Sequence, residues 1–295
     1  MVRRKRAGRE RVNRYKMQKF DVVIYLVLFF VGLLCLFPLM YVFSVSLTPI
    51  TEVYENGGFV LIPKEITFEA YRSILTGSGI PRALRVTVGI SVVGTFVSVV
   101  MTTLVAYPLS RKDLPGRKYL VPFFVFTMLF SGGTIPTYLV VKAVGLTGSY
   151  LSLIVPTAVS TYNMLVMKAF YESLPVELSE AARIDGAGEF SVLYKIIIPL
   201  SKPVMMTVGL FYLVSYWNTY FSALMYITED TMQPLQIVLR RLLAASSSLQ
   251  NVDQVMPSTT LQMAAVIVSC LPVLMIYPFL QKYFTKGMVL GAVKG

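Results

Sequence analysis

The chain of 295 residues contains no histidine, two cysteines and few charged residues, which make up 14% of it. Without histidine, and with Cys35 and Cys270 far apart in the sequence, we expect no dedicated transition-metal site. Both cysteines lie in long apolar segments, so neither is placed for an extracellular disulfide. A soluble domain carries about 25% charged residues. The composition therefore excludes an ordinary soluble protein.

Charge is absent from long stretches of the sequence. Segments without Asp, Glu, Lys or Arg cover residues 22–50, 86–110, 119–141, 143–167, 203–228 and 254–281. Each has the roughly 20 residues that a helix needs to cross about 30 Å of hydrocarbon. We therefore predict an all-α, polytopic membrane protein with six transmembrane helices. The first two helices are expected at about 21–47 and 86–109, and the third within 119–141. The last three are expected at about 150–170, 203–227 and 261–283.

The distribution of basic residues predicts the orientation of the chain in the membrane. If the N-terminus is cytoplasmic, most of the 27 Lys and Arg residues lie on the cytoplasmic side, as the positive-inside rule requires. The basic segment 1–20 is then a topology anchor that attracts anionic lipid, rather than a nucleic-acid arm or a cleavable signal peptide. We expect a six-helix membrane domain over 21–283 and a cytoplasmic C-terminal tail over 284–295.

The polar loop 172–202, between the fourth and fifth expected helices, is longer than a helical bundle normally needs. Pro175 suits the first position of a helix, and Gly186 and Gly188 are expected to end that helix and reverse the chain. A second short helix, about 189–197, is predicted to stop at Pro199. We expect a compact helix–turn–helix that transmits a rigid-body push. The alternative is an ordinary polar connector.

The third charge-free stretch contains Gly132, Gly133 and Pro136 within five residues. These residues weaken a helix and free backbone groups, which at membrane depth must lie beside protein or water. One interpretation is a broken helix that lines a pathway. The other is a tight helix crossing that needs small residues.

The charge-free segments at the centre of the six expected spans contain no Asp, Glu, Lys, Arg or His, whereas carriers driven by proton or sodium gradients usually bury such groups in the membrane. The chain also has no nucleophile–base pair and no phosphate-binding loop, which argues against an intramembrane enzyme. An external source of energy is therefore the simpler hypothesis, with a gradient-driven carrier as the less favoured alternative. The loop 172–202 is the obvious place for that source to attach.

The loop also carries a specific motif: Glu180-Ala181-Ala182, three residues, Gly186, nine residues, then Ile196-Ile197-Ile198-Pro199. This pattern resembles the EAA loop of membrane subunits of binding-protein-dependent ABC importers, with Ile198 where that loop usually has Leu. From about residue 20 onward the chain is similar to the second permease of maltose-type systems, and closer to the Gram-positive subgroup for larger oligosaccharides. Residues 130–138, Trp217-Asn218 and 291–295 add to the resemblance.

The resemblance implies a permease subunit in the bacterial cell membrane that forms half of a translocation pathway for a sugar or oligosaccharide. It implies that a cytoplasmic coupling helix sits in a cleft of a separate ATPase, with the contact residues Glu180, Ala181, Ala182, Asp185, Gly186 and Ala187. The C-terminal tail would reach between two ATPase subunits through Gly291, Val293, Lys294 and Gly295. A loop at 228–260 would meet a sugar-binding protein.

The resemblance further implies a second permease as partner, two ATPase subunits or a homodimer of one, and contact with membrane lipid but not nucleic acid. ATP and Mg would be used by the ATPase, with no cofactor bound by this chain. Another solute, such as an amino acid, peptide, phosphate or metal chelate, is the alternative cargo. The candidate residues of the substrate pathway are Tyr216, Trp217, Asn218, Tyr220, Gly132 and Gly133.

The aromatic cluster in the fifth expected helix is the candidate for contact with a sugar. Aromatic faces stack on sugar rings, and an Asn amide both donates to and accepts from hydroxyl groups. In a continuous helix Tyr216 and Tyr220 would share a face. Helix packing together with an aromatic belt at the membrane interface is the alternative.

Overall fold

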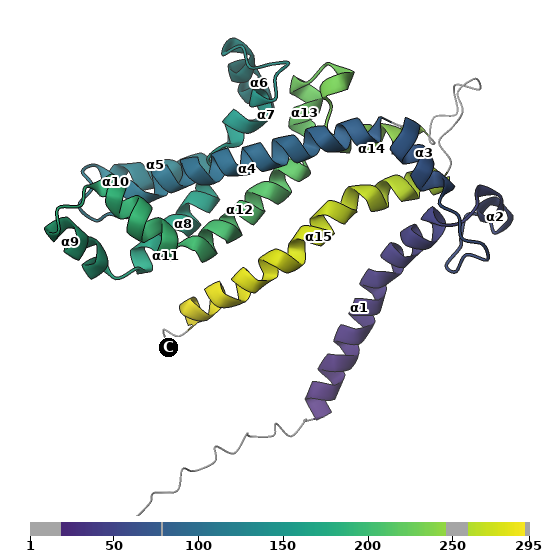
Figure 1. Ribbon diagram of the computed structural model, residues 1–295, viewed down its shortest axis with the longest axis horizontal. Helices are drawn as coiled ribbons and strands as arrows, with labels where there is room; N and C mark the ends of the chain where they lie inside the picture. The colour runs from purple at the N-terminus through teal and green to yellow at the C-terminus, as the bar shows by residue number, and fades with distance from the viewer. Residues whose placement is uncertain (1–18, 78, 246–258, 293–295) are drawn as a thin grey trace, which may run out of the picture.

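The computed structural model describes residues 19–77, 79–245 and 259–292, and this part of the chain is helical, without strands. The all-α prediction is therefore confirmed (Figure 1). The α-helices are α1 (Lys19–Ser46), α2 (Ile50–Glu55), α3 (Glu69–Gly77), α4 (Ile80–Ser110), α5 (Arg117–Leu129), α6 (Thr134–Ala143), α7 (Leu151–Ile154), α8 (Thr161–Ser173), α9 (Val176–Ile184), α10 (Glu189–Val192), α11 (Ile198–Leu200), α12 (Lys202–Trp217), α13 (Phe221–Tyr226), α14 (Leu235–Ala245) and α15 (Thr259–Ala292).

Three of these helices, α1, α4 and α15, are long and apolar enough to cross a membrane. Three pairs of shorter helices pass the same test when each pair is joined across a bend: α5 with α6 (115°), α7 with α8 (49°), and residues 189–200 with α12 (81°). By length and composition, the described residues therefore contain three candidate spans, or up to six if each bent pair is one span. The chain is a multi-pass membrane protein.

The break predicted around Gly132 and Gly133 is present, because α5 ends at Leu129 and α6 begins at Thr134. Gly133 has φ +88° and ψ 174°, a backbone conformation open to glycine but not to residues with a Cβ. Of the two interpretations, the structure has the broken helix. Its role in a pathway stays a prediction.

Several boundaries differ from those expected. The second helix begins at Ile80 rather than about 86, and α15 continues to Ala292, through the segment predicted to be a tail. The fourth helix is interrupted between Thr157 and Thr161, and the fifth ends at Trp217 instead of about 227. A run without charge shows which residues can lie in lipid, but it does not show where the backbone turns.

Helix α4 is the centre of the bundle and packs most extensively against α12 and α8. Its buried face is built mainly from small and hydroxyl-bearing residues, whereas Phe96 and several valines, such as Val92 and Val93, are exposed. Small residues allow close approach of helices in lipid, where apolar side chains gain little by burial. The buried positions of this face include Thr87, Ser91, Gly94, Ser98 and Thr102.

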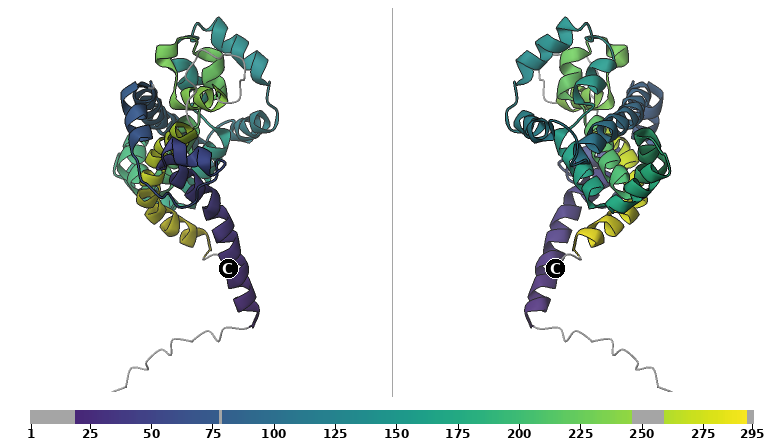
Figure 2. Two further views of the ribbon diagram at one scale, coloured as in Figure 1. Left: turned by 90° about the vertical axis from the view of Figure 1, so that its right-hand side faces the viewer. Right: turned by 90° about the vertical axis from the view of Figure 1, so that its left-hand side faces the viewer.

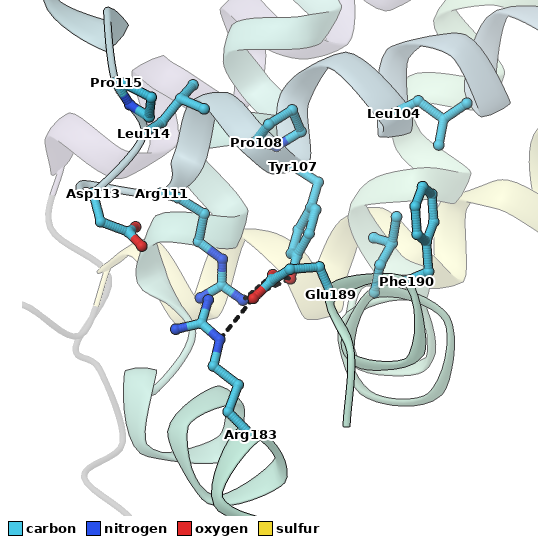
Figure 3. Close-up of a pocket in the computed structure, with 11 residues that line it drawn as sticks. Leu104, Tyr107, Pro108, Arg111, Asp113, Leu114, Pro115, Arg183, Glu189 and Phe190 are labelled. Atoms are coloured by element: carbon cyan, nitrogen blue, oxygen red, sulfur yellow. Dashed lines mark hydrogen bonds and ion pairs between the residues drawn. The ribbon is translucent and has the colours of Figure 1, made fainter. Parts of the chain in front are cut away.

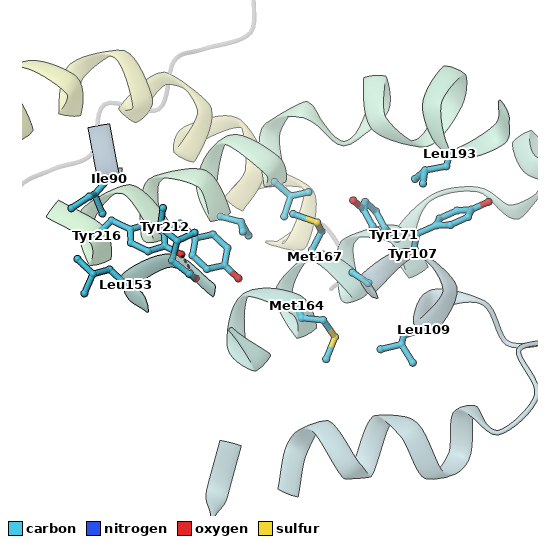
Figure 4. Packing of buried hydrophobic residues seen from close by; sticks show 14 of the residues in the cluster. Ile90, Tyr107, Leu109, Leu153, Met164, Met167, Tyr171, Leu193, Tyr212 and Tyr216 are labelled. Atoms are coloured by element: carbon cyan, nitrogen blue, oxygen red, sulfur yellow. Dashed lines mark hydrogen bonds between the residues drawn. The ribbon is translucent and has the colours of Figure 1, made fainter. Parts of the chain in front are cut away.

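Helix α1 diverges from the bundle, and most of its side chains are exposed (Figures 1 and 2). It contacts α15. On the bundle itself, the buried core extends from Ile90, Leu153 and Tyr216 at one end to Met167 and Tyr171 at the other (Figure 4).

Candidate functional site

The motif residues of the loop form α9 and the turn that ends it. Asp185 is the C-cap, and Gly186 follows with φ +83°. The Gly186 N–H donates to the Arg183 carbonyl at 3.0 Å, and the Ala187 N–H donates to the Ala182 carbonyl at 2.9 Å. This pair of bonds is a Schellman motif, which requires a left-handed residue at the position of Gly186. The prediction that glycine ends this helix is confirmed.

The same turn explains why Ala182 and Ala187, the two residues of the motif that face inward, are small. Ala182 and Ala187 are both partly buried and pack against the main hydrophobic core. In a Schellman motif these two positions make the accompanying apolar contact. Ser179, one turn earlier, is buried as well. One face of α9 is therefore fixed to the membrane domain.

The opposite face of this region is open to solvent. Glu180, Ala181 and Asp185 are exposed, and Ile184 has 87% of its surface exposed. Phe190 and Tyr194, in the helical segment that follows, are 82% and 74% exposed. Large apolar side chains that are exposed within one short segment are typical of an interaction site. We call residues 176–200 the hairpin.

The hairpin is tied to the end of α4 by a polar cluster. Arg183 Nε donates to Glu189 Oε1 at 2.7 Å, and the Tyr107 hydroxyl donates to Glu189 Oε2 at 2.8 Å (Figure 3). Arg111 Nη2 in turn donates to the Tyr107 hydroxyl at 2.7 Å. The hydrogen bond from Arg183 to Glu189 raises the pKa of Arg183. The carboxylate of Glu189 thus joins the two parts of the hairpin to a membrane helix.

A cavity of about 600 Å³ lies at this junction. Figure 3 shows Arg111, Arg183 and Glu189 at its polar side and Leu104, Pro108 and Phe190 among its apolar lining. The polar cluster thus joins the end of α4 to the hairpin beside this cavity.

The second helical segment of the hairpin differs from the prediction. It does not stop at Pro199 but continues to Leu200, and residues 193–197 form a π-helical turn. Proline has no N–H to donate within a helix, and π-helical turns are a known way to accommodate such an interruption. Here the Ile198 N–H donates to the Leu193 carbonyl, five residues back. Pro175, expected at the first helical position, is instead the N-cap residue of α9.

The predicted pathway residues are separated by the end of α12. Tyr216 and Trp217 are 3% and 5% exposed, and each forms a hydrogen bond inside the chain: the Tyr216 hydroxyl with Ser98 Oγ at 2.8 Å, and Trp217 Nε1 with the Ser269 carbonyl at 3.2 Å. Asn218 is exposed and caps the helix through Nδ2, which donates to the Val214 carbonyl at 2.9 Å.

Tyr220 lies beyond that cap, so the prediction that Tyr216 and Tyr220 share a helical face is wrong. A side chain that bonds its own helix backbone competes with the continuing helix, which explains the early end at Asn218. Gly132 and Gly133 are exposed at the break between α5 and α6. Of the six residues, Tyr216 and Trp217 are buried, whereas Asn218, Gly132 and Gly133 are exposed.

The predicted tail is only partly described. Gly291 lies in the last turn of α15, and Val293, Lys294 and Gly295 lie outside the described residues. The predicted docking loop 228–260 is described except for residues 246–258, and α14 covers Leu235–Ala245 of it.

Sequence reasoning missed a hydroxyl network that holds the break in the fourth helix. The Ser160 N–H donates to the Tyr212 hydroxyl at 2.8 Å, and the same hydroxyl bonds Thr102 Oγ1 at 2.7 Å. The Tyr216 hydroxyl contacts the Ile154 carbonyl at 3.3 Å. Two tyrosines on α12 thus satisfy backbone groups on both sides of the bend. Ser and Thr at helical spacing in the second charge-free stretch were the available signal.

The fold defines a class of protein: a multi-pass helical membrane protein, here with exposed side chains on the hairpin of residues 176–200. A family model described as the binding-protein-dependent transport system inner membrane component matches residues 117–290, more than half of the chain. The chain belongs to this family, as the sequence resemblance predicted. By family it is a permease subunit and not an enzyme.

Individual relatives agree with this assignment. The polygalacturonan/rhamnogalacturonan transport system permease YtcP of Bacillus subtilis is 43% identical, over 95% of this chain and 100% of its own. The trehalose transport permease SugB of Mycobacterium tuberculosis is 26% identical, over 88% and 93%. A chain from a crystal structure of a bacterial ABC transporter that imports the acidic polysaccharide alginate is 31% identical, with TM-score 0.82, over 90% and 96%.

Proposed function

We propose that this chain forms half of the translocation pathway of an ABC importer for an oligosaccharide and couples transport to a separate ATPase. The observation that carries the proposal is the hairpin, which has an exposed apolar face on one side and a fixed attachment to α4 on the other. The cargo is proposed from the relatives, whose names specify polygalacturonan, trehalose and alginate transport.

The proposed partners follow from the same architecture. A second permease subunit would complete the pathway and cover the exposed apolar faces of α1 and α4. Two ATPase subunits, using ATP and Mg, would receive the hairpin of each permease, and an extracytoplasmic sugar-binding protein would deliver the cargo. Both termini and the hairpin would then lie in the cytoplasm of a bacterial cell.

The hairpin would act as a lever with two attachments. When the ATPase subunits close on ATP, they would displace α9 as a rigid body, because its end is locked by the Schellman motif and its inner face is packed. The bonds of Glu189 to Arg183 and Tyr107 would pass that displacement to the cytoplasmic end of α4. Packed elements of this kind switch between discrete arrangements rather than deform smoothly.

The test is reconstitution of the complete importer in proteoliposomes, with uptake of a labelled oligosaccharide measured. The proposal predicts uptake that requires both ATP and the sugar-loaded binding protein and that persists when an ionophore collapses ion gradients. Uptake without ATP that the ionophore abolishes would establish the gradient-driven alternative. Uptake of only an amino acid, a peptide, phosphate or a metal chelate would refute the proposed oligosaccharide cargo but would leave the assignment as an ABC importer intact.

A further inference from the structure

Helix α14 lies against the end of α4 that is opposite to the hairpin. The Leu235 N–H donates to Thr87 Oγ1 at 2.8 Å, near the start of α4, whereas Tyr107 and Arg111 of the polar cluster lie at its other end. Helix α4 has 31 residues and is therefore about 45 Å long. In the proposed orientation α14 is therefore at the outer mouth of the protein, far from the ATPase.

One face of α14 meets the turn that follows α12. Gln236 Nε2 is 3.4 Å from the Trp217 carbonyl, and the Arg240 guanidinium carbon lies 4.9 Å from the centre of the Tyr220 ring. Gln236 and Arg240 are four residues apart, so they share a face of the helix. The exposed guanidinium group of Arg240 therefore lies over the ring of Tyr220, which is two residues after the exposed Asn218.

The charge of Arg240 has no carboxylate partner among the described residues. The neighbouring Arg241 differs, because its Nη1 is 2.9 Å from Asp230 Oδ1, and the bond holds the pKa of Asp230 below its usual range. Two adjacent arginines on one helix thus differ in their partners. Arg241 is engaged by an acid of the chain, and Arg240 rests on Tyr220 with its N–H donors available.

We propose that Arg240, positioned by Tyr220, binds a carboxylate of an acidic saccharide at the outer mouth of the pathway. A guanidinium group presents a planar fork that matches a carboxylate with two parallel hydrogen bonds. Stacking on the ring reduces the freedom that the long side chain would otherwise lose on binding. The inference rests on the proposed function, and it specifies a class of cargo: a saccharide that contains uronic acid units.

The test compares Arg240→Gln with Arg241→Gln in the complete importer in proteoliposomes. The two substitutions remove the same charge from adjacent positions, so Arg241→Gln is the matched control. The probes are oligogalacturonate and alginate oligosaccharides, and docking of the sugar-free binding protein is measured in parallel. Arg240→Gln is expected to lower uptake of at least one acidic probe at subsaturating concentration by about tenfold, as for loss of a charge-assisted hydrogen-bond pair. Arg241→Gln is expected to stay within about twofold.

The outcomes separate this inference from the proposed function. Unchanged uptake of the acidic probes by Arg240→Gln would overturn it, and so would equal losses in both variants. Weaker docking of the sugar-free binding protein to Arg240→Gln would also overturn it, because the arginine would then serve a protein contact. A wild-type importer that carries only neutral saccharides would refute the acidic cargo while the proposed function stands. No ATP-driven uptake of any saccharide would instead refute the proposed function.

Discussion

Replacing Gly186 with alanine tests whether the turn at the end of α9 fixes the hairpin. Gly186 has φ +83°, and a Cβ added there would meet no atom within 4 Å. The substitution therefore adds no clash, and its cost is the backbone strain of a left-handed residue, about 1–2 kcal/mol. Since 1.4 kcal/mol is a factor of ten in an equilibrium constant, the equilibrium constant for closing the Schellman motif is expected to fall by about tenfold.

Gly188→Ala is the matched control, because Gly188 lies two residues away with φ −72° and also has no neighbour within 4 Å of an added Cβ. Amide hydrogen exchange of Gly186 and Ala187 in the wild type, and of the same positions in each variant, measures the opening of the motif. Exchange is expected to rise about tenfold in Gly186→Ala and to change little in Gly188→Ala. In the assembled importer, Gly186→Ala should also reduce transport per ATP hydrolysed. Equal exchange in both variants would refute the reasoning.

The membrane core supports two further predictions. Gly94→Ala would place a Cβ 2.8 Å from the buried Tyr216 ring, so its free energy of unfolding, measured by thermal unfolding in detergent, should fall by about 1–3 kcal/mol. Gly89→Ala on the same helix is the control, because an added Cβ there meets open space. Equal melting temperatures of the two variants would contradict the packing of α4 on α12. Tyr212→Phe removes the hydroxyl that accepts the Ser160 N–H and should destabilise the protein by about 1–3 kcal/mol. Tyr194→Phe, at an exposed position, is its control, and similar stability of these two variants would count against the network.

The sequence alone predicts the features that depend on local chemistry. Runs without charge identify the apolar segments, the Gly132-Gly133 pair gives the break between α5 and α6 as one of two interpretations, and Gly186 predicts the end of α9. Each of these follows from the properties of a few adjacent residues. The spacing of Glu180, Ala182 and Gly186 also identified the family, because the motif combines a helix with the cap that ends it.

The features that sequence reasoning missed depend on contacts between distant residues. The bend in the fourth helix is possible because the hydroxyl of Tyr212, 52 positions further along, accepts the Ser160 N–H. The early end of α12 puts Tyr216 in the core and leaves Tyr220 under Arg240. The bond between Glu189 and Tyr107 joins residues 82 positions apart. No local pattern states these pairings.

The most direct test of the central claim is site-specific cross-linking of the hairpin in the assembled importer. Cys35 and Cys270 are first replaced by serine, and a single cysteine is introduced at Ile184, which is 87% exposed. We expect a cross-link from this position to the ATPase subunit, with a yield that changes when ATP is bound. An active importer in which residue 184 forms no cross-link with the ATPase, in any nucleotide state, would contradict it.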